Sequence, residues 1–377
     1  MRILTFTPYF PPHLGGLETL VGELTADLVR RGHEVAVFTS SEPLGLPEHD
    51  EWHGAAVRRF PLHSPLYRNE VRRLAEVRSA FGAAREAFAP DLTHVHLADG
   101  AVMYHVLTQA RHPSPTVLTV HSAIAASEAR PGTVLHQALL GADAVTACSQ
   151  AMLEAVVAVA PAVAPRARVV LNGIDTTRID ATPLPAGDPG GDAVVLLAGR
   201  HVPEKGLDVG LRAVALLADR EPGLRVLLVG DGPAHDALLA LAAELGIADR
   251  VEATGAVAGS EMSALYARAT VVAVPSRYAE PFGIVAVEAG LAGRPVVASA
   301  AGGLPEIVVD GVNGLLVPQD DPTALAGALG TLLADRALAA RLGAAGRERA
   351  VGEFSMTRHT DAITAVYDEV VEASRGG

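Results

Sequence analysis

Short apolar runs alternate with longer amphipathic segments along this chain, and this alternation limits what it can fold into. The runs "RILTFTPYF" (2–10) and "HEVAVFTS" (33–40) flank "LETLVGELTADLVRRG" (17–32), whose apolar spacing predicts a helix. A strand–helix–strand start of this kind builds parallel sheets. Further strands are predicted for "LTHVHL", "PTVLTVHS", "AVTACS" and "RVVLNGI", and further helices for "NEVRRLAEVRSAFGAAREAFA" and "MLEAVVAVAPAVA".

The stretch "ATPLPAGDPGGD" (181–192) divides the chain, because proline, glycine and aspartate at this density are typical of a linker. Since 377 residues exceed what one core usually holds, we expect two doubly wound α/β domains, 1–181 and 193–355, joined by a linker at 182–192. The segment 356–377 either caps the second domain or crosses back to the first. Strands are predicted after the linker for "AVVLLAG", "RVLLVG", "RVEATG", "VVAVPS", "PVVAS" and "GLLVP".

The chain is acidic and holds one cysteine, which argues against several functions. Its 43 acidic and 30 basic residues give a formal charge of -13, so we expect no nucleic-acid partner. Cys148 alone forms no internal disulfide and suits a reducing compartment. The sequence has no run of about 18 apolar residues and no long apolar region of a signal peptide at its start. We therefore expect a cytoplasmic protein without a transmembrane segment.

Of the 30 basic residues, 29 are arginine and one is lysine, Lys205. An ammonium and a guanidinium are not equivalent at a crowded anion site, so this lysine either survived by chance or does what arginine cannot. It lies in "GRHVPEKG" (199–206), five residues after Arg200, in a loop that opens a helix. A strand end followed by a helix N-terminus suits an anion, and two cations there suit a diphosphate. The alternative is that both are ordinary surface cations.

Two glycine-rich loops also follow predicted strands. In "HLGGLE" (13–18), Gly15 and Gly16 allow close approach of the backbone to a ligand, and in "VGDGP" (229–233) Gly230 and Gly232 allow the same. Each loop is equally well explained as a turn. The first is neither the dinucleotide pattern GxGxxG nor a Walker loop, which counts against a Rossmann oxidoreductase.

Two carboxylates lie eight residues apart in "SRYAEPFGIVAVE" (276–288), which is otherwise nearly all apolar. We expect a helix that begins near Pro281 or Phe282, which would separate Glu280 from Glu288 by about 12 Å and about 80°. That distance is too long for one metal ion or a close acid/base pair, but it suits the two ends of an elongated polyol. The alternative is that Glu280 interacts with the helix dipole and that Glu288 is a solvated helix residue. Against it, Glu288 lies among apolar residues and needs a partner for its charge.

The order and spacing of "GRHVPEKGLD", "VGDGP", "PSRYAEPFGIVAVEA", "ASAAGGLPEIV" and "DGVNGLLVPQDDP" resemble the family 4 retaining glycosyltransferases. The opening "FTPYFPPHLGGLETLVGELTADLVRRGHEVAVFT" is similar to that family's start. The likeness covers nearly the whole chain. It implies the GT-B fold, two facing Rossmann-like domains with an interdomain cleft, in which the final helix returns to the first domain.

The resemblance also implies roles. Arg200 and Lys205 would hold the donor diphosphate and stabilise the leaving nucleotide, while Glu280 would contact hydroxyls of the transferred sugar. Glu288 would bind the ribose hydroxyls, and the Gly16 amide would lie near the diphosphate when the domains close. The implied donor-binding set is Gly15, Gly16, Gly230, Gly232, Pro281, Phe282, Gly283, Ile284, Val285 and Glu288.

His121, in "LTVHSA", matches a family histidine that lines the sugar site and completes the implied catalytic set with Arg200, Lys205 and Glu280. From its residues alone it is a strand-end histidine, structural or functional. The resemblance implies a retaining hexosyltransferase of the EC 2.4 class, acting by front-face attack on a UDP- or GDP-linked sugar such as GDP-mannose. Catalysis would rest on charge stabilisation in a water-poor cleft, with neither a metal nor a cofactor.

The acceptor side is less specified. We expect a small-molecule or lipid acceptor, and the sequence leaves open both peripheral membrane association and the oligomeric state. The candidates for acceptor contacts, each equally well explained as a solvated surface residue, are Arg68, His96, Asp99, Glu128 and Arg130.

The sequence leaves two other functions open. A GT-B sugar-nucleotide epimerase or hydrolase would share the architecture but should carry further acid/base carboxylates in the first half of the chain, where no clear set is visible. A non-catalytic nucleotide-sugar binding protein would not need Arg200, Lys205, Glu280 and Glu288 together.

Overall fold

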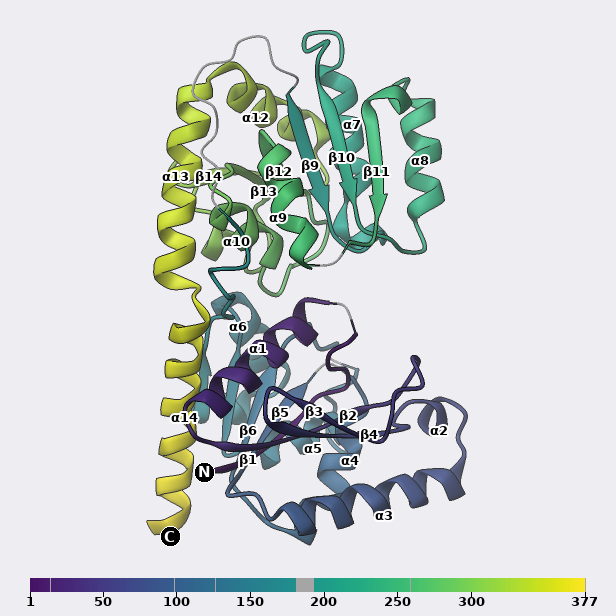
Figure 1. Ribbon diagram of the computed structural model, residues 1–377, viewed down its shortest axis with the longest axis vertical. Helices are drawn as coiled ribbons and strands as arrows, with labels where there is room; N and C mark the ends of the chain where they lie inside the picture. Colours follow the sequence, from purple (N-terminus) through teal and green to yellow (C-terminus); the bar gives the residue numbers. More distant parts are fainter. Residues whose placement is uncertain (14, 98, 126, 181–192, 258, 377) are drawn as a thin grey trace. The chain divides into compact units, whose positions relative to one another are not determined.

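The computed structural model describes residues 1–13, 15–97, 99–125, 127–180, 193–257 and 259–376. The expected linker, 182–192, lies outside these residues. The chain forms two compact units, one made of Met1–Ile174 with Met356–Gly377 and the other of Asp175–Ser355 (Figure 1). Each unit is a sheet with helices packed against it, as the alternation in the sequence predicts.

The first unit is built on an eight-stranded sheet, in which all strands are parallel except the edge strand β3. The sequence did not predict β3 or β4. The reason is that the residues of β3 are mostly polar and exposed, which leaves no apolar pattern to find. In sheet order the strands are β3 (His49–Trp52), β4 (Ala55–Phe60), β2 (Glu34–Ser40), β1 (Arg2–Phe6), β5 (Leu92–Leu97), β6 (Thr116–Val120), β7 (Ala144–Ala147) and β8 (Ala167–Val169).

The last helix of the chain, α14 (Met356–Gly376), belongs to this first unit. Its apolar face shares a core with residues of β1 and α1, and the Tyr367 hydroxyl lies 2.6 Å from His94 Nδ1. Met356 N donates to Ile174 O at 2.9 Å. The other helices of this unit are α1 (Gly16–Arg30), α2 (Ser64–Tyr67), α3 (Val71–Phe88), α4 (Val102–Thr108), α5 (Val134–Gly141) and α6 (Gln150–Val159).

The second unit has a six-stranded parallel sheet in which β12 pairs with β9, although β10 and β11 come between them in the chain. The direction of winding therefore reverses between β9 and β12, the place where open α/β sheets bind ligands. In sheet order the strands are β11 (Val251–Gly255), β10 (Arg225–Val229), β9 (Val194–Ala198), β12 (Val271–Val274), β13 (Val296–Ser299) and β14 (Gly314–Val317). The helices are α7 (Leu207–Leu217), α8 (His235–Glu244), α9 (Gly259–Arg268), α10 (Ile284–Leu291), α11 (Leu304–Ile307), α12 (Pro322–Ala334) and α13 (Arg336–Glu353).

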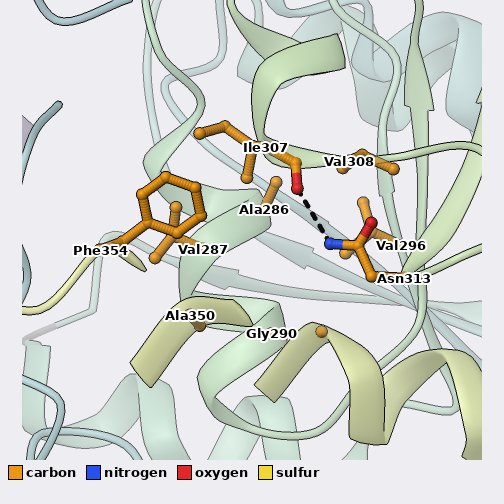
Figure 2. Close-up of a pocket in the computed structure, with 10 residues that line it drawn as sticks. Ala286, Val287, Gly290, Val296, Ile307, Val308, Asn313, Ala350 and Phe354 are labelled. Carbon is orange, nitrogen blue, oxygen red and sulfur yellow. Dashed lines mark hydrogen bonds between the residues drawn. The ribbon is translucent and has the colours of Figure 1, made fainter. Parts of the chain in front are cut away.

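Helices α10 and α13 pack closely through glycine. A Cβ on Gly290 would lie 2.9 Å from the Gly346 carbonyl oxygen, so a larger side chain would separate the helices. Figure 2 shows the space beside this contact, about 10 Å³, which is near the lower limit for one water molecule. Asn313 lies at its edge, where its amide nitrogen donates to Ile307 O at 2.9 Å. This space is a packing void, and the buried Asn313 side chain closes the loop before β14.

A buried arginine lies under the sheet of the first unit. Arg85 is fully buried and donates to neutral acceptors, including Thr93 Oγ1 at 2.9 Å and His105 Nδ1 at 3.2 Å. Burial, with the nearby charge of Arg85 second, lowers the pKa of His105 to about 3. A neutral His105 is thus part of the buried hydrogen-bond network.

The first prediction follows from His105. Because its folded pKa lies below the unfolded value of 6.5, the unfolded chain binds the extra proton as the pH falls. This contribution to stability is complete above about pH 6.5 and is lost progressively towards pH 3, costing about 2 kcal/mol between pH 7 and pH 5. Denaturant unfolding at both pH values should show a smaller loss for His105→Gln than for the wild type. Replacement of the exposed His49 by Gln is the control, and equal losses in all three proteins would contradict the prediction.

Gly302 holds the backbone around Glu280 in place. Its φ is +58°, and a Cβ there would overlap Glu280 O and lie 2.5 Å from Glu280 N. Gly303 N also donates to Glu280 O at 2.7 Å. The loop after β13 therefore fixes the loop after β12 by direct backbone contact.

The second prediction concerns this contact. Gly302→Ala should lower the free energy of unfolding by several kcal/mol, since two backbone segments must move apart as well as accept a left-handed alanine. Gly293→Ala is the matched control, because Gly293 has φ +70° but nothing within 4 Å of a built Cβ. It should cost only the left-handed strain of about 1–2 kcal/mol. Equal losses in denaturant unfolding would show that the backbone contact contributes nothing.

Candidate functional site

Three loops that carry predicted residues of the second unit meet where β9, β10 and β12 end. Gly230 has φ +122°, and a Cβ there would overlap Gly199 O, so the "VGDGP" loop lies directly against the "GRHVPEKG" loop. His201 N donates to Asp231 O at 2.8 Å and joins the same two loops. Gly232, with φ +152°, approaches His201 in the same way. The two glycines are required for the contact between the loops.

Lys205 and Glu280 form an ion pair at this edge of the sheet. Lys205 Nζ lies 2.7 Å from Glu280 Oε1 and 3.0 Å from Oε2. Gly206, at φ +62°, brings the lysine loop against Pro275 at the end of β12. Glu280 is only 8% exposed, so its charge depends on this pairing.

Two hydroxyl groups complete the shell of Glu280. Tyr278 donates its hydroxyl to Glu280 Oε1 at 2.9 Å, and Ser276 donates to Oε2 at 2.8 Å. Burial raises the pKa of Tyr278, the Glu280 carboxylate adds to this, and the positive charge of Arg200 opposes it. The exposed Arg200 is therefore within electrostatic range of the group around Lys205 and Glu280.

The expected helix start after Glu280 is wrong. Helix α10 begins at Ile284, after a left-handed Gly283 with φ +116° that ends the continuity of any helix from Pro281. Pro281 and Phe282 therefore precede the helix, and the separation worked out for eight helical residues does not hold. The Phe282 side chain is buried and meets Phe354 edge-on at 5.7 Å, so a ligand could reach Phe282 only through its backbone. Ile284 and Val285 form the first turn of α10, where amide groups are free of helical partners.

Glu288 lies on α10 and is half-buried, with a partner on α9. The Tyr266 hydroxyl donates to Glu288 Oε2 at 2.9 Å. Burial and then the Glu288 charge raise the pKa of Tyr266 well above its usual value, so its hydroxyl remains a donor. The Glu288 carboxylate is thus oriented by a fully buried ring.

Three side chains near Arg200 form a potential metal-ligand group. His201, Asp231 and His235 each offer one ligand atom, and these atoms all lie within 4.8 Å of one another. None of these three residues was predicted from the sequence as a metal ligand. The two Nδ1 atoms of the histidines are 3.0 Å apart and the rings are nearly parallel, at 5°. The nitrogens thus share a hydrogen bond, and a cation would have to replace the shared proton.

The remaining predicted residues lie in the first unit. Gly15 precedes α1 with an extended backbone, φ 168°, and Gly16 is the first residue of that helix. His121 follows β6, and its Nε2 lies 2.9 Å from Nδ1 of His96 on β5. Burial, with the nearby His359 second, lowers the pKa of His121 to about 3. His121 is therefore a neutral imidazole whose orientation is fixed by His96.

Sequence reasoning found the charged groups but missed the residues that hold them. Ser276 and Tyr278 lie within the quoted stretch around Glu280, so their hydroxyl groups were an available signal. Tyr266 is separated from Glu288 by 22 residues, and nothing in the sequence links the two. The sequence suggests His96 only as a candidate for acceptor contacts, whereas the structure pairs it with His121.

Comparison with known proteins gives consistent matches over nearly the whole chain. The model for group 1 glycosyl transferases matches residues 183–349, and the model for Glycosyltransferase Family 4 matches residues 14–178. A D-inositol 3-phosphate glycosyltransferase of Saccharomonospora viridis is 34% identical over 395 residues, which cover 96% of this chain and 91% of that protein. A glycogen synthase of Mycobacterium tuberculosis is 29% identical over 406 residues, which cover 100% of this chain and 96% of that protein.

A solved structure agrees with these matches. HepE of Anabaena in complex with UDP-glucose superposes with a TM-score of 0.80 at 25% identity, over 98% of this chain and 100% of that one. Among the described residues, no helix combines the length and apolar character needed to cross a membrane. The chain belongs to the group 1, family 4 glycosyltransferases, with the GT-B fold, and is a retaining enzyme of the hexosyltransferase class that takes a nucleotide-sugar donor.

Proposed function

We propose that this enzyme transfers a hexosyl group from a UDP-linked sugar to an acceptor hydroxyl, with GDP as the alternative nucleotide. The observation that carries the proposal is the pairing of Lys205 with Glu280 beside Arg200, at the winding reversal of the second sheet. UDP comes first because the HepE structure, which shares the fold, is a complex with UDP-glucose. The relatives differ in the acceptor that their names give, D-inositol 3-phosphate in one and glycogen in the other.

The two cations are proposed to stabilise the leaving nucleotide. When the glycosidic bond to the diphosphate breaks, the departing nucleoside diphosphate carries more negative charge than the bound donor. Fixed cations at that position lower the barrier because they are already oriented before the charge develops. Lys205 Nζ is held by Glu280 and Tyr278, so its position is set in advance. Arg200 and Lys205 would supply the charge that a divalent ion supplies elsewhere.

The two glutamates are proposed to bind the two sugars of the donor. Glu280 accepts from Lys205, Tyr278 and Ser276, and hydroxyls of the transferred sugar would compete for the remaining acceptor capacity of its oxygens. Glu288 is half-buried, is oriented by the Tyr266 hydroxyl and as a carboxylate only accepts hydrogen bonds, which suits contact with ribose hydroxyls.

The backbone and the first unit would supply the remaining contacts. Gly230, Gly232 and the amides of residues 282–285 are proposed to lie along the donor, where the absence of a Cβ or of a helical partner leaves them accessible. From the first unit, we assign Gly15 and Gly16 to the diphosphate and the neutral His121 to the transferred sugar, as the family pattern implies. Front-face attack by the acceptor hydroxyl would then retain the anomeric configuration.

Nucleotide selectivity gives the first test. With UDP, GDP, ADP and TDP in thermal unfolding, we expect UDP to raise the melting temperature most, since a ligand at 100 times its Kd adds about 2.7 kcal/mol. The shift should shrink strongly in Glu288→Ala and persist in the matched control Glu244→Ala, which removes an exposed carboxylate from α8. A melting temperature that none of the four nucleotides moves would overturn the donor site.

Lys205 gives the second test. Lys205→Ala should lower kcat/KM by about 10²–10³, the usual effect of removing one donor to a developing charge. Lys205→Arg should also lose activity, because the guanidinium fork cannot take the position of the ammonium between Tyr278 and Glu280. Arg212→Ala removes an exposed cation from α7 and should leave the rate unchanged. If Lys205→Arg kept the wild-type rate, the presence of lysine rather than arginine at this position would have no functional reason.

A further inference from the structure

A cavity of about 320 Å³ opens in the first unit where β5 and β6 end. Leu97 at the end of β5 and Asp99 just after it line the cavity, together with Ser122 after β6 and Thr133 at the start of α5. Its volume is at the lower end of the range for small-molecule sites. The cavity begins one residue after His121, the side chain that the proposed function assigns to the transferred sugar. Its place beside His121 makes it a candidate site for the acceptor.

The charged residues that line this cavity are both acidic. They are Asp99 and Glu128, and among the described residues of the lining none is lysine or arginine. Asp99 Oδ2 lies 2.9 Å from His63 Nε2, so a protonated His63 cancels one charge and a neutral His63 cancels none. The lining keeps a net negative charge in either case. Arg130, the nearest cation in the sequence, donates through Nε to Ser127 O at 3.0 Å within its own loop.

Two helix starts oppose this negative charge only weakly. A helix N-terminus carries roughly half a positive charge, which is less than one carboxylate. At α4 that charge already meets Asp99, whose Oδ1 accepts from Ala101 N at 2.8 Å. At α5 the Thr133 hydroxyl accepts from His136 N at 3.2 Å. A phosphate group in the cavity would therefore meet net repulsion.

The same lining suits hydroxyl groups. Carboxylates only accept hydrogen bonds, and the hydroxyls of Ser122 and Thr133 both accept and donate them. The aliphatic side chains of Ile124 and Val134 also line the cavity and can contact the C–H face of a ring. We propose that this cavity binds the acceptor and that the acceptor is an uncharged polyhydroxyl compound, a sugar or a cyclitol without phosphate. The inference rests on the proposed function and narrows it.

The experiment compares matched acceptors that differ by one phosphate. The pairs are glucose with glucose 6-phosphate and inositol with D-inositol 3-phosphate, with UDP-glucose as donor. The rate is followed by release of UDP, and the product by mass spectrometry. Binding of UDP is measured first by thermal shift, without acceptor. We expect the neutral member of a pair to react at least about tenfold faster, because a phosphate within a few ångströms of the cavity carboxylates would be repelled by them.

A charge reversal connects the preference to the cavity. Glu128→Lys should lower the ratio of neutral to phosphorylated rates by about tenfold. The control, Glu86→Lys, reverses an exposed charge on α3, near the start of β5, whereas the cavity lies where β5 ends. This variant should leave the ratio unchanged. Faster transfer to phosphorylated acceptors, equal ratios in the two variants, or no transfer to any neutral sugar by a protein that binds UDP would overturn the inference. Failure to bind any nucleotide would instead overturn the proposed function.

Discussion

Both units depend on parallel pairing of strands. A parallel strand must be reached through a crossover, so every such strand in a sheet runs the same way and ends at the same edge. In the second unit this brings residues from the ends of β9, β10 and β12 together although up to 80 residues separate them. The glycines at these ends then allow the loops to touch through their backbones. Contact between these loops brings Lys205 within ion-pair distance of Glu280.

The sequence predicted the elements that carry a strong apolar pattern. The run "LTHVHL" is β5 residue for residue, because its leucines and valine mark a strand even though Thr93, His94 and His96 are polar. The polar β3 gave no such pattern, and its antiparallel direction is set by pairing with β4 alone. The start of α10 was misplaced because proline at 281 is a good first helical residue, while the left-handed Gly283 that prevents this is visible only in the backbone.

The residues of the candidate site also differ in whether the sequence alone reveals them. Charges in an apolar setting, such as Glu280 and Glu288, stand out from the sequence, because burial of a charge needs an explanation. Lys205 stands out because it is the one lysine among 30 basic residues. The groups that satisfy these charges do not stand out. Tyrosine and serine hydroxyls are common in cores, and only the fold determines that Tyr266 reaches Glu288 from another helix. The sequence therefore indicates which buried charges need a partner more readily than it indicates which residues are those partners.

The place of α14 also bears on how the protein is made. The core of the first unit includes Tyr367 and Ile363 alongside Ile3 and Leu24, so part of this core is synthesised only after the whole of the second unit. The second unit, in contrast, is one continuous segment, Asp175–Ser355, and is complete before α14 is synthesised. Domains usually fold in the order of synthesis. Here the unit that begins first must finish last, and until then it exposes the apolar surface that α14 covers.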